Sequence, residues 1–392
     1  MMTAYTLRLF DTDLLHFTLE GRGIEGLVAQ IEWINEDEKH RFPLDLELSS
    51  AGLVHWLERR VIPKNRTFVE EILQTLGLRQ NDTKGIIDVC KGLSLNDSYW
   101  IVPKDFAGTF AEYNLYDNRF SEILSLVAYT GVGQSAGAFS TSPELTTNGM
   151  LPKAWRFIDP YGIYLYKGGT TGASNTGNEP YSEFYACQIA KAMGLAAVQY
   201  DLENWKGILA SKCKLFTSPE VSFVPISRIV KSGGLAACLD YYKKLSPDAL
   251  EQVKSMLVFD AVIYNEDRHF GNFGVLRDNR TGEVTGPAPI FDNGLSLFAM
   301  APKTLWDELD VYAKTRTPPY GNLTFETICE TALGKVQLSQ LHRLIGFRFT
   351  RHSKLNWPEE RLQATERQVQ NRVHQLLELS RQKQKPPREP ER

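Results

Sequence analysis

The chain opens with alternating hydrophobic and polar positions, the period of a half-buried β-strand. Positions 5–10 alternate in this way and positions 15–19 repeat the pattern after a short polar break, so we expect a β-hairpin. Hydrophobic residues then recur with helical spacing over 53–60 and 67–76. Pro63 lies between these stretches and disfavours one continuous helix, so the pattern predicts two separate helices.

A second block of patterned sequence begins near residue 150. Positions 154–158 and 163–166 are predicted strands, and residues 159–162 between them have the Asp-Pro-Tyr-Gly composition of a tight turn. A helix follows over 181–193 and is expected to end at Gly194, because glycine is favoured just beyond a helix C-terminus. The pattern therefore predicts a hairpin followed by a helix.

The remainder of the chain turns from strands to helices. Two further strands are predicted at 212–216 and 221–225. The clearest helix covers 247–264, where Ser246 is a favourable N-cap and the hydrophobic positions keep a helical period. A charged helix is predicted over 358–383. The second half is therefore expected to be mainly helical.

Composition narrows the function classes only slightly. A length of 392 residues permits two or three domains with a substantial core. The net charge of −3 gives no general electrostatic reason to bind nucleic acid or a membrane. The five cysteines lack the paired spacing of a metal or redox site, and no apolar run reaches the ~20 residues of a membrane span. The start of the chain lacks a signal-peptide profile, so we expect a cytoplasmic protein with free thiols.

The most informative segment is 265–274, Asn-Glu-Asp-Arg-His-Phe-Gly-Asn-Phe-Gly. Asp267 and Asn272 lie five positions apart, and Asp292 follows a short apolar stretch further on. Phosphoryl transfer from a magnesium nucleotide uses a carboxylate facing the acceptor hydroxyl and oxygen ligands on the metal. We therefore interpret Asp267 as the catalytic residue and Asn272 and Asp292 as Mg²⁺ ligands, with ATP and Mg²⁺ as cofactors. A surface loop with a salt bridge is the plain alternative.

A lysine and a glutamate are expected to complete the nucleotide site. Lys167 ends the second strand of the predicted hairpin and precedes two glycines, a position suited to the α- and β-phosphates. Glu183, on the following helix, is the favoured partner of this ammonium. Glu179 is the rival, although a carboxylate at a helix start is also favoured by the helix dipole alone. For Lys167 the alternative is an ordinary exposed lysine.

Residues 146–153 are the predicted phosphate loop, with Gly149 as its glycine. One glycine is a weak signal, and the support comes from its place just before the lysine-bearing strands. Lys153 is a candidate phosphate contact, and an exposed strand lysine is the equal alternative. Residues 214–218, which include Phe216, are the predicted hinge against the adenine, where backbone groups make the contacts.

Two other features have competing interpretations. His269 resembles a general base, but a scaffold role through hydrogen bonds to backbone carbonyls is favoured. A basic cluster beside Trp56 is either a nucleic-acid patch or a solvated helix end whose indole packs on the core, and the acidic chain favours the second. The cluster consists of Arg59, Arg60, Lys64 and Arg66.

Together these elements predict an α+β, two-lobed kinase-like fold. The order is a glycine-containing loop, two strands, a helix, two more strands, and then a helical half that carries the acidic motifs. We expect an α/β accessory domain over 1–122, a kinase N-lobe over 123–218, a helical C-lobe over 219–384 and a disordered tail over 385–392.

With these residues in place, the chain resembles the HipA-like serine/threonine kinases, bacterial relatives of the phosphatidylinositol 3/4-kinase fold. The resemblance covers roughly residues 140 to 350 and rests on Asn265-x-Asp267-Arg268-His269-x-x-Asn272-Phe273, Asp292, the helix segment 183–195 and Gly149-x-x-x-Lys153. The N-terminal third resembles, more loosely, a subgroup with its own preceding domain, through segments 56–66, 94–100 and 116–121.

The resemblance implies a Mg²⁺- and ATP-dependent kinase that acts on protein serine or threonine. It also implies a toxin-like role with a helix-turn-helix antitoxin as partner, substrates in the translation machinery, and autophosphorylation three residues before the loop glycine, at Thr146 here. We expect no membrane or nucleic-acid partner. Two alternatives stay open: a kinase of the same fold acting on a lipid or small molecule, and a nucleotide-dependent module that binds DNA or protein.

Overall fold

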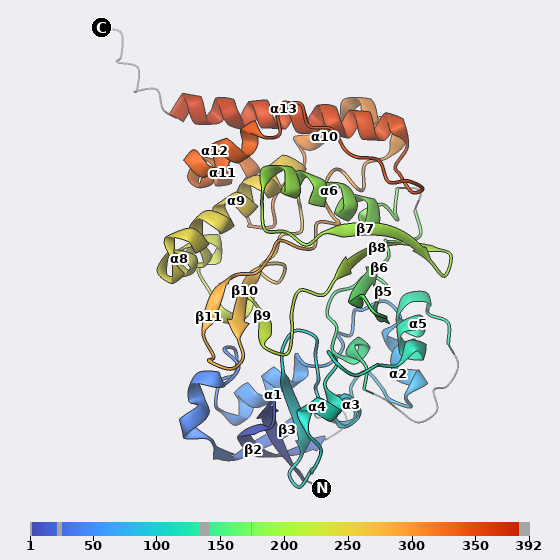
Figure 1. The fold of residues 1–392 in the computed structure, drawn as a ribbon, viewed down its shortest axis with the longest axis vertical. Coiled ribbons are helices and arrows are strands. Elements are labelled where there is room, and N and C mark those ends of the chain that lie inside the picture. The colour runs from blue at the N-terminus through green and yellow to red at the C-terminus, as the bar shows by residue number, and fades with distance from the viewer. Residues whose placement is uncertain (1, 22–25, 134–140, 174, 384–392) are drawn as a thin grey trace. The chain divides into compact units, whose positions relative to one another are not determined.

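The computed structural model describes residues 2–21, 26–133, 141–173 and 175–383 (Figure 1). The predicted tail, 385–392, lies outside these residues. The chain divides into two compact units. Unit 1 comprises Met1–Gly168, Lys212–Val224 and Val275–Thr285, and unit 2 comprises Gly169–Ser211, Pro225–Gly274 and Gly286–Arg392. The division into an accessory domain and two lobes stays a prediction.

Unit 1 begins with a four-stranded sheet in the order β3-β2-β1-β4. Its strands are β1 Thr3–Leu9, β2 Thr12–Gly21, β3 Leu27–Ile34 and β4 Tyr99–Pro103. The predicted hairpin is confirmed, because β1 and β2 pair antiparallel with Tyr5 opposite Phe17. The alternating hydrophobic residues of both strands are buried, and they form one core with the two predicted helices. These are α1 Ser50–Glu58 and α2 Val69–Thr75, and α3 Thr83–Cys90 adds to the same core.

The second part of unit 1 contains the predicted strand pair. The further elements are η2 Glu36–Arg41, α4 Phe110–Tyr113, α5 Glu122–Thr130, η3 Pro143–Leu145, β5 Lys153–Ile158 and β6 Gly162–Lys167. β5 and β6 pair antiparallel, with Lys153 opposite Lys167, so the hairpin prediction is confirmed. The Ser125 hydroxyl donates to the Trp155 carbonyl at 2.8 Å and fixes α5 to β5.

Two further sheets follow the orders β5-β6-β8-β7 and β11-β10-β9. The additional strands are β7 Tyr200–Trp205, β8 Ile208–Lys214, β9 Val221–Pro225, β10 Gly274–Asp278 and β11 Val284–Pro287. The hydrophobic pattern predicted no strand at β7. Its letters are Tyr-Asp-Leu-Glu-Asn-Trp, it lies at a sheet edge, and Leu202 is its buried residue, so little hydrophobic alternation marks it.

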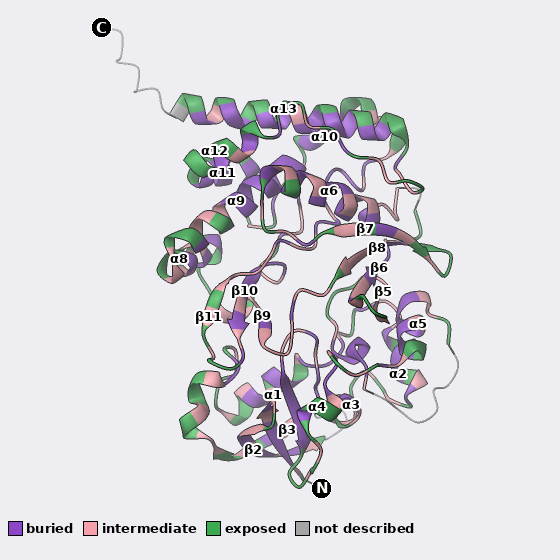
Figure 2. Cartoon of the chain, viewed as in Figure 1, coloured by how far each residue is buried: buried purple, intermediate pink, exposed green. Residues whose placement is uncertain are grey.

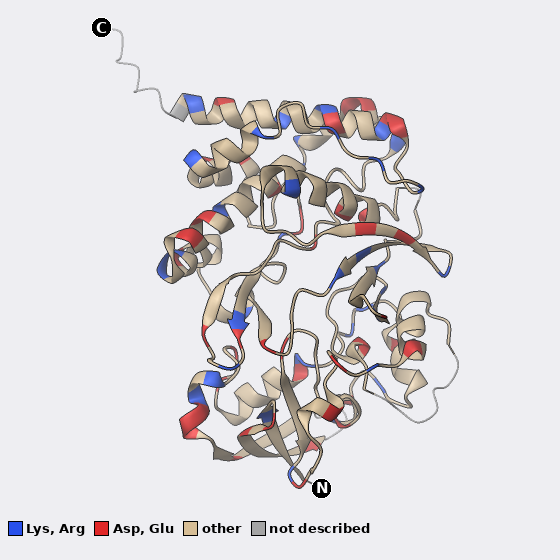
Figure 3. Ribbon diagram, in the orientation of Figure 1, with Lys and Arg blue, Asp and Glu red and all other residues tan. Residues whose placement is uncertain are grey.

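Unit 2 is mainly helical. Its helices are α6 Glu179–Met193, α7 Ile226–Ile229, α8 Gly234–Leu245, α9 Pro247–Ile263, η4 Lys303–Glu308, α10 Leu309–Ala313, α11 Phe325–Ala332, α12 Lys335–His342 and α13 Glu359–Lys383. The helices predicted over 181–193, 247–264 and 358–383 are confirmed as α6, α9 and α13. The C-terminal turns of α9 are wholly buried (Figure 2). α13 packs one face on α9 to α12 and carries mixed charges on its exposed face (Figure 3).

Candidate active site

Helix α9 ends where the acidic motif, residues 265–274, begins. Its start is fixed by Ser246, whose hydroxyl accepts the Ala249 N–H at 3.0 Å. Its end is turned by Tyr264, which has a left-handed φ of 51° although it is not glycine. The next N–H, of Asn265, still donates to the Asp260 carbonyl at 2.9 Å. The motif therefore leaves a rigid, buried helix end in a fixed direction.

Asn265 ties the loop to α9 through its side chain. It is fully buried, and its Nδ2 donates to Asp260 Oδ1 at 3.1 Å. Its Oδ1 accepts the Asp267 N–H at 3.0 Å. Both the nitrogen and the oxygen of the carboxamide therefore form hydrogen bonds within the protein. The backbone of Asp267 is thereby held in place, and the residue is half-buried.

Arg268 is the centre of the loop's hydrogen-bond network. It is fully buried and its Nε lies 3.0 Å from Asp260 Oδ2. Its Nη1 donates to the carbonyls of Asn272, at 3.1 Å, and of Phe291. Burial lowers the pKa of Arg268, but contact with the Asp260 carboxylate outweighs it and the pKa is raised. The guanidinium is therefore a fixed cation that joins the loop to the segment around Asp292.

The Asn272 side chain is fixed within the loop by a hydrogen bond. It is buried, and its Nδ2 donates to the Asp267 carbonyl at 2.9 Å. The carboxamide nitrogen is committed to this bond, so Oδ1 is the atom available to ligate a cation. The five-residue spacing therefore closes a small loop in which Asp267 and Asn272 are neighbours.

Asp292 has a left-handed backbone, with a φ of 57°. Such a conformation costs on the order of 1–3 kcal/mol for a residue other than glycine and persists only where its surroundings enforce it. The enforcing bonds are visible: its N–H donates to the Tyr200 hydroxyl at 3.1 Å, and its carbonyl accepts from Arg268 at 3.4 Å. Strain held in this way is common at functional sites.

Glu183 lies beneath the same segment. It is fully buried in α6, and its Oε2 accepts the Asn293 N–H at 2.7 Å. The predicted pairing of Glu183 with Lys167 stays a prediction. The rival, Glu179, has one oxygen accepting the Thr170 N–H at 3.1 Å. Its other oxygen is buried without a hydrogen-bond partner among the described residues.

Within unit 1 the predicted phosphate loop is closed by its own lysine. Lys153 is buried and its Nζ donates to the Asn148 carbonyl at 2.9 Å, so the exposed-lysine alternative is wrong. Gly149 has a φ of +93°, and a Cβ there would lie 2.2 Å from this Nζ. The left-handed backbone at Gly149 therefore favours glycine, and a Cβ there would displace the flexible end of the lysine side chain.

Three other residues of unit 1 were predicted to belong to the nucleotide site or to be phosphorylated. Lys167 is buried at the end of β6, which makes its exposed-lysine alternative wrong. Thr146 is 5% exposed and its hydroxyl donates to the Leu93 carbonyl at 2.8 Å. Phe216 is half-buried and packs edge-on against Phe223, with ring centroids 5.7 Å apart.

The basic cluster is corrected by the structure at two of its four residues. Arg60 is buried, forms two 2.8 Å bonds to Asp97 and lies over the Trp56 ring. Arg66 is buried in an ion pair with Glu144 at 2.5 Å. Neither is part of a solvated basic surface. Trp56 packs in the core, as the plainer interpretation expected.

Arg66 has a role that the sequence did not reveal. Its guanidinium donates to the carbonyls of Glu144 and Lys153, both at 2.8 Å, and thus spans the predicted phosphate loop. The paired Glu144 carboxylate accepts the Trp155 N–H at 2.7 Å. An Arg–Glu pair some 80 positions apart carries no local signal, so only the folded chain brings it to the loop.

His269 is exposed, and its Nδ1 accepts the Gly271 N–H at 3.0 Å. The ring thus supports the loop backbone through an amide donor, where a carbonyl acceptor was expected. Among the described residues there is no group of three His, Cys, Asp or Glu side chains arranged as a metal site. The Asn272 and Asp292 pair would therefore leave the remaining magnesium positions to phosphate and water.

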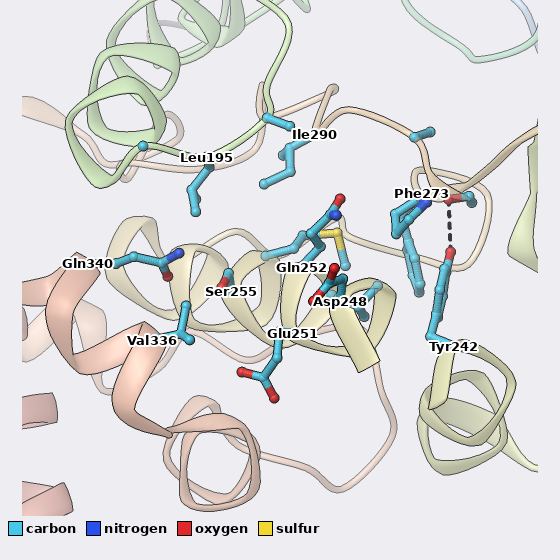
Figure 4. A pocket seen from close by; sticks show the side chains of 17 residues that line it. Leu195, Tyr242, Asp248, Glu251, Gln252, Ser255, Phe273, Ile290, Val336 and Gln340 are labelled. Atoms are coloured by element: carbon cyan, nitrogen blue, oxygen red, sulfur yellow. Dashed lines mark hydrogen bonds between the residues drawn. The ribbon is translucent and has the colours of Figure 1, made fainter. Parts of the chain in front are cut away.

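A cavity of about 360 Å³ lies in unit 2 behind the motif (Figure 4). Its wall includes Phe273, which follows Asn272, and Ile290, which lies two positions before Asp292, together with α9 and α12 residues. The Tyr242 hydroxyl donates to the Gly274 carbonyl at 2.8 Å at one side of it. Its lining does not include Asp267, Asn272 or Asp292.

The sequence was compared with family models and with known proteins. No family model matches the chain. Over 138 residues the sequence is 31% identical to the serine/threonine-protein kinase CtkA of Helicobacter pylori strain J99. The match covers 32% of this chain and 42% of that relative, so it spans less than half of the kinase's length.

Two solved structures extend the comparison. The H. pylori proinflammatory kinase CtkA matches with a TM-score of 0.50 and 20% identity, over 60% of this chain and 92% of that chain. A chain from the Shewanella oneidensis MR-1 toxin–antitoxin complex of HipA, HipB and operator DNA matches with a TM-score of 0.57 and 12% identity, over 96% of this chain and 98% of that chain. The predicted α+β kinase-like fold is confirmed. The chain therefore has the fold of these two kinase structures, and part of its sequence is similar to a serine/threonine-protein kinase.

Proposed function

We propose that this chain transfers the γ-phosphoryl group of a magnesium-bound nucleoside triphosphate, ATP, to a serine or threonine hydroxyl of a protein. One observation carries the proposal: the Arg268 guanidinium donates to the carbonyls of both Asn272 and Asp292, while Asn272 donates to the carbonyl of Asp267. The three candidate residues therefore belong to one rigid network. Phosphoryl transfer depends on such positioning, because the protein contributes orientation and electrostatic stabilisation more than covalent chemistry.

In this mechanism Asp267 orients the acceptor hydroxyl and receives its proton. Asn272 Oδ1 and the Asp292 carboxylate would hold the magnesium ion, which neutralises charge on the phosphate oxygens when bound. Glu183 would act on Asp292 indirectly, since it fixes the following amide. Lys167 is the proposed contact of the α- and β-phosphates. Gly149 and Lys153 form the proposed phosphate loop, and Phe216 lies in the proposed hinge against the adenine.

The proposed acceptor and partners depend on the proteins to which the chain is similar. A protein hydroxyl is favoured because the matching H. pylori protein is a serine/threonine-protein kinase. A helix-turn-helix antitoxin partner is suggested by the S. oneidensis complex, in which the structural relative is bound with HipB.

Self-phosphorylation of Thr146 requires its loop to leave the protein interior, because the hydroxyl is buried and hydrogen-bonded. No helix of the described residues is long and apolar enough to cross a membrane.

The test is transfer from labelled ATP with matched variants. Purified protein is incubated with MgATP and a bacterial extract, and labelled protein is separated from labelled lipid. Asp267→Ala should lower the rate by about 10²–10⁴-fold with nucleotide affinity retained, whereas Asp292→Ala should also weaken magnesium-nucleotide binding. Arg280→Met, a change in an exposed ion pair of unit 1, should leave transfer intact. Wild-type transfer by Asp267→Ala protein would refute the assignment of that residue.

A further inference from the structure

The segment 312–320 of unit 2 lies against the acidic motif. The Tyr320 hydroxyl donates to the Arg268 carbonyl at 2.6 Å, and its ring stacks on Phe270 at 5.5 Å. Arg316 reaches Glu266, the neighbour of Asp267, with Nη1 at 3.1 and 3.2 Å from the two carboxylate oxygens. Any change in this segment is therefore transmitted to the loop that carries Asp267.

Arg316 presents its other edge to a threonine. Its Nε and Nη2 donate to Thr315 Oγ1 at 3.2 and 2.9 Å. This pair of nitrogens is the fork with which arginine binds the oxygens of a phosphate group. The guanidinium carbon also lies 4.3 Å from the centre of the Tyr312 ring, which limits its movement. One guanidinium thus bridges a hydroxyl on one edge and a carboxylate beside Asp267 on the other.

Thr315 is accessible where Thr146 is not. Thr315 is exposed, whereas Thr146 is 5% exposed and bonded to the Leu93 carbonyl. The Thr315 hydroxyl donates to the Tyr312 carbonyl at 2.7 Å, a bond to an exposed chain segment that a phosphate ester can forgo. A hydroxyl that is exposed and already faces an arginine fork is suited to carry a phosphate.

We propose that Thr315 is a phosphorylation site of this chain, and that its phosphate binds the Arg316 fork and strengthens the bridge to Glu266. The proposal rests on the proposed function for its phosphoryl donor. Thr315 Oγ1 attacks the γ-phosphorus of MgATP, the bond from that phosphorus to the β–γ bridging oxygen breaks, and ADP leaves. The hydroxyl proton passes to the carboxylate of Asp267 in the molecule that acts as kinase. The product orders the segment and increases the rate of transfer to other acceptors.

The chemistry favours a clamp over competition between the two anions. Nη1 serves Glu266 while Nε and Nη2 face Thr315, so a phosphate need not displace the carboxylate. Glu266 is also held by the backbone of Thr317, and its side chain is half-buried. A dianion on the far edge of Arg316 therefore restricts a guanidinium that is already committed to the loop.

The first test maps the site. Protein incubated with MgATP is digested and phosphopeptides are identified by mass spectrometry, with casein as an added acceptor. Phosphate at Thr315, absent in Thr315→Val and retained in Thr317→Val, supports the proposal. Thr317 is the matched control, an exposed threonine of the same segment. Phosphate on casein or elsewhere in the chain, without phosphate at Thr315, overturns the proposal and leaves the proposed function standing. No transfer to any acceptor refutes the proposed function and, with it, self-phosphorylation at Thr315.

The second test does not depend on the chain's own activity. Phosphoserine is incorporated at position 315 during translation, and the second pKa of its phosphate, ordinarily about 6, is followed by phosphorus NMR. Contact with Arg316 should lower this pKa by roughly half a unit or more, and Arg316→Gln should restore it. Arg316→Lys should restore it in part, since lysine keeps the charge without the fork. The same pKa in all three proteins would overturn the clamp.

The same protein reports on transfer. Phosphoserine at position 315 should raise the casein rate on the order of fivefold over the unphosphorylated protein, and the gain should vanish in Arg316→Gln. A gain that persists without Arg316 would show that the phosphate acts by another route.

Discussion

Replacement of Arg268 by methionine removes the cation at the centre of the candidate site while keeping an unbranched chain of similar length. The change leaves Asp260, which is 3% exposed, without its ionic partner, and it leaves the carbonyls of Asn272 and Phe291 without their donor. Breaking a buried pair by removal of one partner costs about 3–5 kcal/mol, because an uncompensated charge remains in the interior. Unfolding of one unit of this size loses about 2–4 °C in Tm per kcal/mol.

The expected result is therefore a fall of roughly 6–20 °C in the unfolding temperature, measured by circular dichroism or calorimetry. Arg280→Met is the matched control, because Arg280 pairs with Glu220 at 3.3 Å but its side chain is 69% exposed. An exposed pair contributes about 0–1 kcal/mol, so its Tm should hardly move.

The double variant Asp260→Leu with Arg268→Met decides whether the unpaired charge causes the loss. Without a buried carboxylate, part of the stability should return, although the carbonyl bonds remain absent. Equal Tm values for Arg268→Met and wild type would refute the view that Arg268 holds the site together. If the double variant lost as much in Tm as Arg268→Met alone, the unpaired Asp260 carboxylate would not be the cause of the loss.

Three further outcomes follow from other contacts. Gly169→Ala should destabilise by about 1–3 kcal/mol, because its Cβ would lie 2.7 Å from the backbone Cα of Gly177. Gly168→Ala meets nothing closer than 3.6 Å and should be neutral, and urea unfolding compares the two variants. Burial raises the pKa of Glu266, an effect that Arg316 opposes. In Arg316→Gln that pKa should rise further, so the Tm deficit of this variant should be absent at pH 4 and grow as pH rises through the raised pKa. Burial also raises the pKa of four thiols to about 11 or about 12, those of Cys90, Cys187, Cys238 and Cys329. A thiol reagent at pH 8 should therefore label the half-buried Cys213 first, and rapid labelling of all five in the native protein would contradict their burial.

Local signals were enough for several of the elements, whereas β3, β4, β10 and β11 were not predicted. The hairpin of β1 and β2, the hairpin of β5 and β6, and the helices α6, α9 and α13 follow from periodicity and from caps such as Ser246 and Gly194. Periodicity failed at β7, since an edge strand with mostly exposed side chains has no need of alternation. The alternation that reveals a strand exists only where one face is buried.

The sequence by itself determined the chemistry of the candidate site: a carboxylate and a carboxamide five residues apart, a second aspartate, and a glycine before a lysine. These identities are local, and the spacing of Asp267 and Asn272 within one loop needs no tertiary information. The tertiary structure decided which groups hold them. Arg268 joins the Asp260 carboxylate to the carbonyls of Asn272 and Phe291. Glu183 supports the segment after Asp292, and Arg66 supports the predicted phosphate loop across some 80 positions. A buried charged side chain pairs with an opposite charge that lies near it in space. The separation of the two residues in the sequence does not indicate which residues will pair.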